Sequence, residues 1–173
     1  RWAGADVTSA AIENHRKLSA WCAGNPVPLV IARNEDLFDQ MSRLKVPPRY
    51  RCVICKRFML QVAARMLKNE GALAIVTGEN LGQVASQTLA NLAVIACSVS
   101  VPVLHPLITW DKEETITLAR QIGTFDATPG DLACRAVPKM PATAAVSEEI
   151  TLWEERLEID RLADEACSAL RFV

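Results

Sequence analysis

The chain has 173 residues, half of them apolar, and a formal net charge of −1. This length allows one domain with a buried core. The balanced charge and high apolar content exclude a disordered chain and a uniformly basic nucleic-acid-binding domain, although a local basic patch is compatible with them. No apolar stretch reaches the roughly 18–20 residues of a membrane span, and the start of the chain lacks a signal-peptide core. We therefore expect no membrane span and a reducing, cytoplasmic setting.

Helix and strand patterns alternate along the first half of the chain. Thr8 or Ser9 is a suitable cap for a helix over residues 10–23. The apolar run 28–32 is typical of a buried parallel strand. Asn34 then precedes a helix whose apolar stripe includes Leu37, Phe38, Met41 and Leu44.

After Pro47 and Pro48 the pattern predicts a long helix, from near Tyr50 to Glu70, with Gly71 as its stop. The remaining elements are expected in this order: a strand at 72–76, a helix at 86–96, a strand at 101–104, a helix from Asp111 to Gly123 with Glu114 completing its start signal, and a charged helix from Ser147 to about Leu170. We expect residues 124–146 to form an ordered functional loop or a crossover.

This alternation predicts an α/β protein with a doubly wound, Rossmann-like parallel sheet and one domain over residues 1–173. Only three strands are clear, and no strand precedes the first helix. We therefore expect that an N-terminal strand–loop–helix unit is missing and that the chain is truncated at its start.

The polar loop 77–88 is the most informative segment, because it follows a strand and precedes a helix. Ligands bind at this position, the carboxyl edge of a parallel sheet. The alternative is a capped turn, in which Gly78 and Gly82 relax the backbone and Ser86 caps the helix.

Cys52 and Cys55 form a CxxC pair at the start of the long helix, so both thiols lie on one face. Such a pair is a redox site, half of a metal site or a coincidence. Cys134 adds a third candidate ligand, and three thiolates fit an iron–sulfur cluster with an open iron better than a closed zinc site. Lys56 and Arg57 extend a basic cluster, with Arg49 and Arg51, that is a candidate for tRNA phosphates or a solvated helix start.

Several stretches, in one order, resemble the catalytic domain of the ThiI family, the tRNA 4-thiouridine synthetases. They are CKRFML (55–60), EGALA (70–74), VTGENLGQVASQTLANL (76–92), PVLHPLITWDKEE (102–114), IGT (122–124), and Cys134 with VPKMPAT (137–143). The resemblance is strong over residues 50–145 and agrees only in pattern over residues 1–49.

The resemblance implies a PP-loop (adenine nucleotide alpha hydrolase) fold and ATP-dependent adenylation of a tRNA uridine, followed by sulfur transfer that forms 4-thiouridine. It also implies Mg²⁺, a homodimer, a sulfur donor such as a cysteine desulfurase persulfide or sulfide, and a link to thiamine thiazole synthesis. The family's Ser-Gly-Gly-x-Asp-Ser phosphate loop is absent, as is its RNA-binding THUMP region. The alternative is a non-catalytic relative that carries a cysteine-based sulfur or iron–sulfur site.

By the same resemblance, the nucleotide and uridine contacts fall on Gly78, Glu79, Gln83, Gln87 and Lys112. The sulfur chemistry falls on Cys134, with Cys52 and Cys55. Three readings remain open for the cysteines: ligands of a [4Fe-4S] cluster, persulfide and disulfide chemistry in which Cys134 attacks and a CxxC cysteine resolves, or a structural role.

Overall fold

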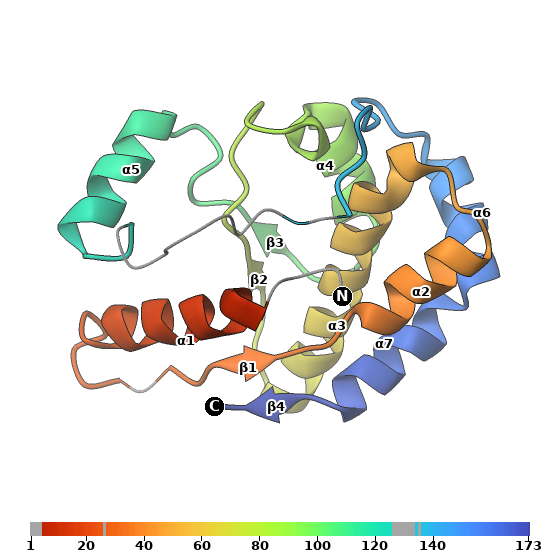
Figure 1. Ribbon diagram of the computed structural model, residues 1–173. Helices are drawn as coiled ribbons and strands as arrows, with labels where there is room; N and C mark the ends of the chain where they lie inside the picture. The colour runs from red at the N-terminus through yellow and green to blue at the C-terminus, as the bar shows by residue number, and fades with distance from the viewer. Residues whose placement is uncertain (1–4, 26, 126–133, 135) are drawn as a thin grey trace. The chain divides into compact units, whose positions relative to one another are not determined.

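The computed structural model describes residues 5–25, 27–125, 134 and 136–173, and the chain divides into two compact units (Figure 1). The larger unit comprises residues 33–109 and 136–169. The smaller unit comprises residues 1–32, 110–135 and 170–173. Compact units can belong to one domain, so the single-domain prediction is not tested by this division.

Helix α3 is the centre of the larger unit, where it contacts β2, α4, α6 and α7. In Figure 1 it lies between the two strands and the helices α2, α6 and α7. The elements of this unit are α2 (Glu35–Arg43), α3 (Arg51–Glu70), β2 (Ile75–Val76), α4 (Leu89–Ala96), β3 (Val103–Leu104), α6 (Ser147–Leu157) and α7 (Ile159–Ser168), with short 3₁₀ turns at Pro48–Tyr50 and Ala85–Gln87.

The strands β2 and β3 pair in parallel, with Ile75 opposite Val103 and Val76 opposite Leu104. Helix α4 connects them, so the expected β–α–β crossover of a parallel sheet is confirmed. Both strands are shorter than the apolar runs that predicted them. Their carboxyl ends place two loops, 77–88 and 105–109, at one edge.

The predicted core of the larger unit is confirmed at α2 and α3. Leu37, Phe38 and Met41 are buried, as their stripe predicts, and Ile54 of α3 is fully buried. Gly71 ends α3 in the left-handed conformation, with φ of 65°, which explains why a glycine stands there.

Two helix boundaries differ from the predictions. Helix α4 begins at Leu89 because Thr88, and not Ser86, is the cap: its hydroxyl accepts a hydrogen bond from the Asn91 N–H at 3.2 Å. The expected single helix over 147–170 is two helices. Glu158 separates α6 from α7 in the left-handed conformation, with φ of 51°.

The smaller unit contains α1 (Ala5–Ser19), β1 (Val30–Ile31), α5 (Lys112–Gln121) and β4 (Arg171–Phe172). The start signal of α5 is confirmed, since Asp111 and Glu114 form a reciprocal capping box. The cap at Thr8 or Ser9 is wrong because α1 begins at Ala5. The predicted parallel strand at 28–32 is also wrong in direction: β1 pairs antiparallel with β4 at the end of the chain. In the described part of the chain, no helix has the length and apolarity that crossing a membrane requires.

Candidate functional site

The loop 77–88 is fixed by an ion pair that sequence reasoning did not anticipate. Lys56 of α3 donates to both carboxylate oxygens of Glu79, at 2.9 and 2.8 Å, and Gln87 donates to the same carboxylate at 2.8 Å. The side chains of Lys56 and Glu79 are only 20% and 13% exposed. Because Lys56 directly follows Cys55, this contact joins the CxxC helix to the polar loop.

A second set of contacts joins the loop after β2 to the loop after β3. The Thr77 hydroxyl lies 2.7 Å from Nδ1 of His105, and the Asn80 amide donates to the Leu107 carbonyl at 3.0 Å. Between these loops and α3 lies a cavity of about 290 Å³, which Lys56, Thr77, Glu79 and His105 line together with apolar side chains. The carboxyl edge of β2 and β3 therefore carries a half-open, mainly apolar cavity with a few charged and polar groups, the usual composition of a ligand site.

The two glycines of the loop differ in what they require. Gly82 has φ of 76°, a conformation that favours glycine. Gly78 has no such φ, and a side chain built there meets nothing within 4 Å. The fold itself therefore does not explain why Gly78 lacks a side chain. Close approach of a ligand to the backbone is a reason that remains.

The other predicted site residues fall into two groups. Gln83 lies on the same loop and is exposed, and Cys52 and Cys55 are half-buried on the first two turns of α3. Lys112, the first residue of α5, and the exposed Cys134 belong to the smaller unit. Across the described residues, no three His, Cys, Asp or Glu side chains gather in a metal-binding arrangement.

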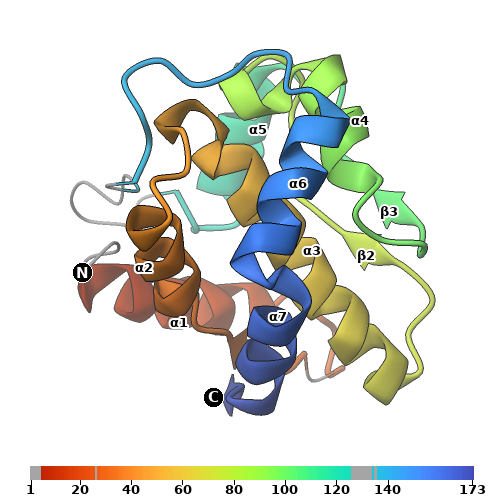
Figure 2. The ribbon, with the colours of Figure 1, turned by 90° about the vertical axis from the view of Figure 1, so that its right-hand side faces the viewer.

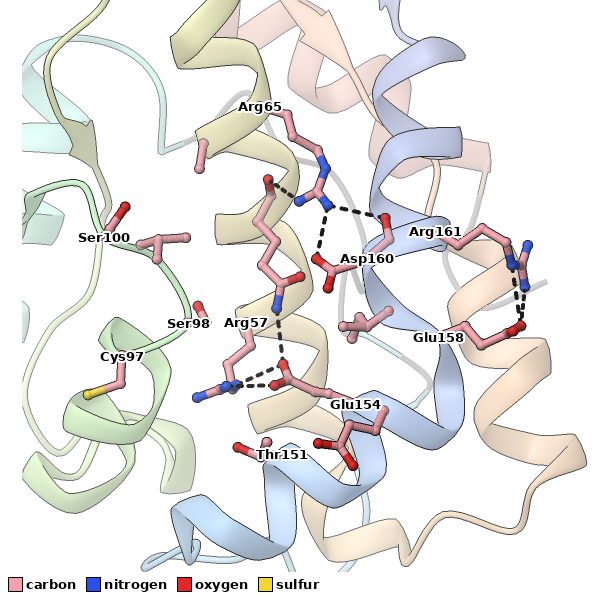
Figure 3. A pocket seen from close by; sticks show the side chains of 15 residues that line it. Arg57, Arg65, Cys97, Ser98, Ser100, Thr151, Glu154, Glu158, Asp160 and Arg161 are labelled. Atoms are coloured by element: carbon pink, nitrogen blue, oxygen red, sulfur yellow. Dashed lines mark hydrogen bonds and ion pairs between the residues drawn. The ribbon is translucent and has the colours of Figure 1, made fainter.

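The predicted basic cluster is wrong for Arg57. Its side chain is 7% exposed and forms a bidentate pair with Glu154 of α6, at 2.8 and 2.6 Å, inside a charged pocket (Figure 3). Gln61 donates to the same carboxylate at 3.2 Å. A buried guanidinium that is already paired cannot reach an RNA phosphate. Arg49 is exposed and stays a candidate for RNA.

Asn91 is a second residue that sequence reasoning missed. It is fully buried in α4, and its amide donates to the carbonyls of Ala85 and Ala142 at 2.7 and 2.8 Å. Its own oxygen accepts from the Ala145 N–H at 2.8 Å. It therefore joins the end of the loop 77–88 to the segment 136–146, which follows Cys134 and runs to α6 across one end of the unit (Figure 2). A single Asn in an apolar helix is the only sequence signal of this role.

The crossover β2–α4–β3 and its loops form an α/β fold with a candidate ligand site at the carboxyl edge of its parallel strands. The family model described as "Thiamine biosynthesis protein (ThiI)" matches residues 3–159, so the chain belongs to the ThiI family.

Curated relatives agree with this family. The chain is 45% identical over 121 residues to a probable tRNA sulfurtransferase of Methanosarcina mazei, an alignment that covers 69% of this chain and 30% of the relative. It is 43% identical over 131 residues to a probable tRNA sulfurtransferase of Thermus thermophilus, and this alignment covers 72% of this chain and 32% of the relative. The chain thus spans about a third of the length of these relatives.

The fold matches a solved structure of a 4-thiouridine synthetase in complex with RNA and bound ATP. The TM-score is 0.91 at 30% sequence identity, over 99% of this chain and 45% of that one. The predicted α/β, Rossmann-like fold class of the PP-loop type is therefore confirmed.

Proposed function

We propose that the protein to which this chain belongs is an ATP-dependent tRNA uridine 4-sulfurtransferase. The observation that carries the proposal is the match in fold, over 99% of the chain, to a 4-thiouridine synthetase that binds ATP and RNA. The polar loop at the carboxyl edge supports it, since this is where α/β proteins bind nucleotides.

The nucleotide site in this proposal includes Gly78, Glu79, Gln83, Gln87 and Lys112. Gly78 leaves its backbone open to a ligand. Gln87 has a buried amide oxygen that lacks a hydrogen-bond partner among the described residues, so it has an acceptor to offer. Lys112 is exposed at the start of α5 and supplies a cation for the phosphates.

Lys56 joins this set because of its position. Its ammonium is fixed at the loop by Glu79, so a cation is already present where the phosphate charge of ATP would arrive. The same contact argues against Glu79 as a Mg²⁺ ligand, since both of its oxygens accept from Lys56 and one also accepts from Gln87. Mg²⁺ then enters with the ATP phosphates, and Glu79 orients Lys56 and Gln87.

The chemistry begins with the uridine. Its O4 attacks the α-phosphorus of ATP, the new P–O bond forms, and pyrophosphate leaves. A sulfur nucleophile then attacks C4 of the base, and AMP leaves with the former O4 oxygen. Adenylation is required because the carbonyl oxygen is a poor leaving group until it is bonded to phosphorus.

The cysteines supply the sulfur chemistry. Cys52 and Cys55 stand three residues apart on α3, which fits two thiolate ligands of one metal group; Cys134 is the third ligand in this proposal. A [4Fe-4S] cluster held in this way would offer an open iron that binds sulfide. If the sulfur arrives instead as a persulfide on Cys134, its outer sulfur attacks C4 and AMP leaves. A CxxC thiolate then attacks the Cys134 sulfur, which releases 4-thiouridine and forms a disulfide between Cys134 and that cysteine; a thiol reductant must reduce this disulfide before the next turnover.

The remaining parts of the proposal concern partners and setting. They are tRNA as the substrate, a persulfide or sulfide donor, a homodimer, a cytoplasmic location and a supply of sulfur for the thiamine thiazole.

The test is thiolation of unmodified tRNA by the full-length protein with ATP and a sulfur donor. Cys134→Ala abolishes 4-thiouridine, measured by nucleoside mass spectrometry, but retains tRNA-dependent pyrophosphate release, because adenylation precedes sulfur transfer. The matched control is Cys97→Ala, at an exposed cysteine outside the proposed site, which retains both activities. Unchanged 4-thiouridine in Cys134→Ala would refute the site assignment.

A second measurement separates the two cysteine readings. An anaerobic preparation that carries a cluster is brown and contains iron, and Cys52→Ala and Cys55→Ala each lose that iron. A colourless anaerobic protein without iron refutes the cluster and leaves the persulfide route.

A further inference from the structure

The larger unit has a further cavity, whose lining includes no residue of the loop 77–88. It is a groove of about 930 Å³ between two segments of the chain. Pro47, Arg49 and Tyr50 line one wall, and residues 138–144 line the other, with Lys139 and Met140 among them.

Both walls adjoin cysteine-bearing segments in the chain. The first wall ends at Tyr50, two residues before Cys52, and the second begins at Pro138, four residues after Cys134. The groove walls are therefore continuous in sequence with both segments that carry the proposed sulfur-transfer cysteines.

The groove is a fixed part of the fold. The Ala142 N–H donates to the Arg49 carbonyl at 3.0 Å, which joins the two walls directly. The buried Asn91 accepts from Ala145 and donates to Ala142, and the Thr88 hydroxyl donates to the Thr143 carbonyl at 2.6 Å. A segment held by backbone contacts at successive residues offers a preformed surface to a partner.

The charges of the groove select its partner. Arg49 and Lys139 are both exposed, and no acidic residue is among the described residues that line the groove. Glu149 accepts a hydrogen bond from the Tyr50 hydroxyl and is 4.0 Å from Arg49. Since the two side chains of that pair are 59% and 49% exposed, the pair is weak and can exchange for a phosphate.

The surface between the two cations is apolar. Met140 is 83% exposed, and prolines flank it on both walls. The Arg49 guanidinium lies over the ring of Tyr50, 4.7 Å from its centre, so its flat face is held in place. Sites that bind single-stranded nucleic acid combine cations, which contact the phosphates, with apolar surface, which contacts the unstacked bases.

From this combination we infer that the groove binds an unpaired segment of the tRNA next to the target uridine, with Arg49 and Lys139 on consecutive phosphates. The inference rests on the proposed function and adds the surface that receives the RNA. An acidic segment of a protein that donates sulfur is the other occupant that the charges admit. The groove fits RNA better, because its exposed apolar surface suits bases.

The experiment compares tRNA binding by the full-length wild-type protein with that of Arg49→Gln, Lys139→Gln and the double variant. Each phosphate contact contributes about 0.7–0.9 to the slope of log affinity against log salt. The double variant is therefore expected to lower that slope by about 1.4–1.8, and to weaken binding roughly 15- to 30-fold at 0.15 M salt. Because both side chains are exposed, the variants fold normally, and circular dichroism and the ATP affinity remain unchanged.

Lys68→Gln is the matched control, since Lys68 is an exposed lysine at the far end of α3 and lies outside the groove; its affinity and slope equal those of wild type. A double variant with wild-type affinity and slope overturns the groove proposal. So does a double variant that binds tRNA normally but needs more sulfur donor, because the groove then holds a protein. If the wild-type protein forms 4-thiouridine, the proposed function stands whichever of these results the double variant gives. If the wild-type protein forms none on any tRNA, the proposed function and the groove proposal both fail.

Discussion

Glu154→Ala is expected to cost a large part of the stability of the chain. The Glu154 carboxylate is the anionic partner of the buried Arg57 guanidinium, and it accepts from both Nε and Nη2 of that group. The two side chains are 7% and 8% exposed, so water does not replace the lost partner. Removing one member of such a pair leaves an uncompensated buried charge, which costs about 3–5 kcal/mol.

The effect is large because stability itself is small. A loss of about 3–5 kcal/mol is a substantial fraction of the roughly 5–15 kcal/mol that typical domains have. Urea unfolding followed by circular dichroism measures it: with a slope of about 2 kcal/mol per molar, the midpoint falls by about 1.5–2.5 M. The double variant Arg57→Met with Glu154→Leu recovers most of this loss, since an apolar pair of similar volume carries no buried charge.

The control is Glu13→Gln, because Glu13 pairs with Arg16 on the exposed surface of α1, where an ion pair contributes little. A loss below about 1 kcal/mol in Glu154→Ala would refute the reasoning. So would a double variant that is less stable than either single variant.

Three further outcomes follow from the same structure. Asn91→Ala removes a fully buried side chain and leaves three backbone partners unmet, of which Ala145 is buried and Ala85 and Ala142 are half-buried. It is expected to cost about 3 kcal/mol, with faster proteolysis of 136–146 than in wild type; equal cleavage would contradict this. The hydrogen bond to Glu149, together with burial, raises the pKa of Tyr50. The stability that this hydrogen bond contributes is therefore complete below about pH 10 and is lost as the pH rises through the raised pKa. The stability advantage of wild type over Tyr50→Phe should shrink in that range, and a constant difference would refute this contribution. Gly71→Ala is expected to lower the free energy of unfolding by about 1 kcal/mol because Gly71 has φ of 65°. Gly78→Ala is expected to keep full stability but to bind ATP more weakly. Equal falls in melting temperature in the two variants would count against the ligand role of Gly78.

Local signals predicted the elements that depend on local physics. The long helix α3 and its stop at Gly71 follow from periodicity and one glycine, and the start of α5 follows from Asp111 and Glu114. The parallel pair β2–β3 follows from two apolar runs and the helix between them.

The features that the sequence did not reveal depend on contacts between distant segments. Strand β1 pairs with the last residues of the chain, and nothing near Val30 signals that partner. Glu158 adopts a left-handed conformation although it is not a glycine, so the sequence contains no signal for the break between α6 and α7.

The candidate site shows the same division. The loop 77–88 was found from its composition and its place after a strand. However, Lys56 and Arg57 are neighbours in the sequence and were assigned one role, whereas the helix turns them to different partners: Glu79 for Lys56 and Glu154 for Arg57. A rotation of about 100° per residue separates adjacent helical side chains, and only the packed structure determines what each one meets.

The most direct test of the central claim is the stoichiometry of the reaction of the full-length protein with unmodified tRNA, ATP and a sulfur donor. The account predicts one AMP and one pyrophosphate for each 4-thiouridine formed, since adenylation of O4 must precede its replacement by sulfur. Formation of 4-thiouridine without ATP, or with release of ADP and phosphate in place of AMP and pyrophosphate, would contradict it.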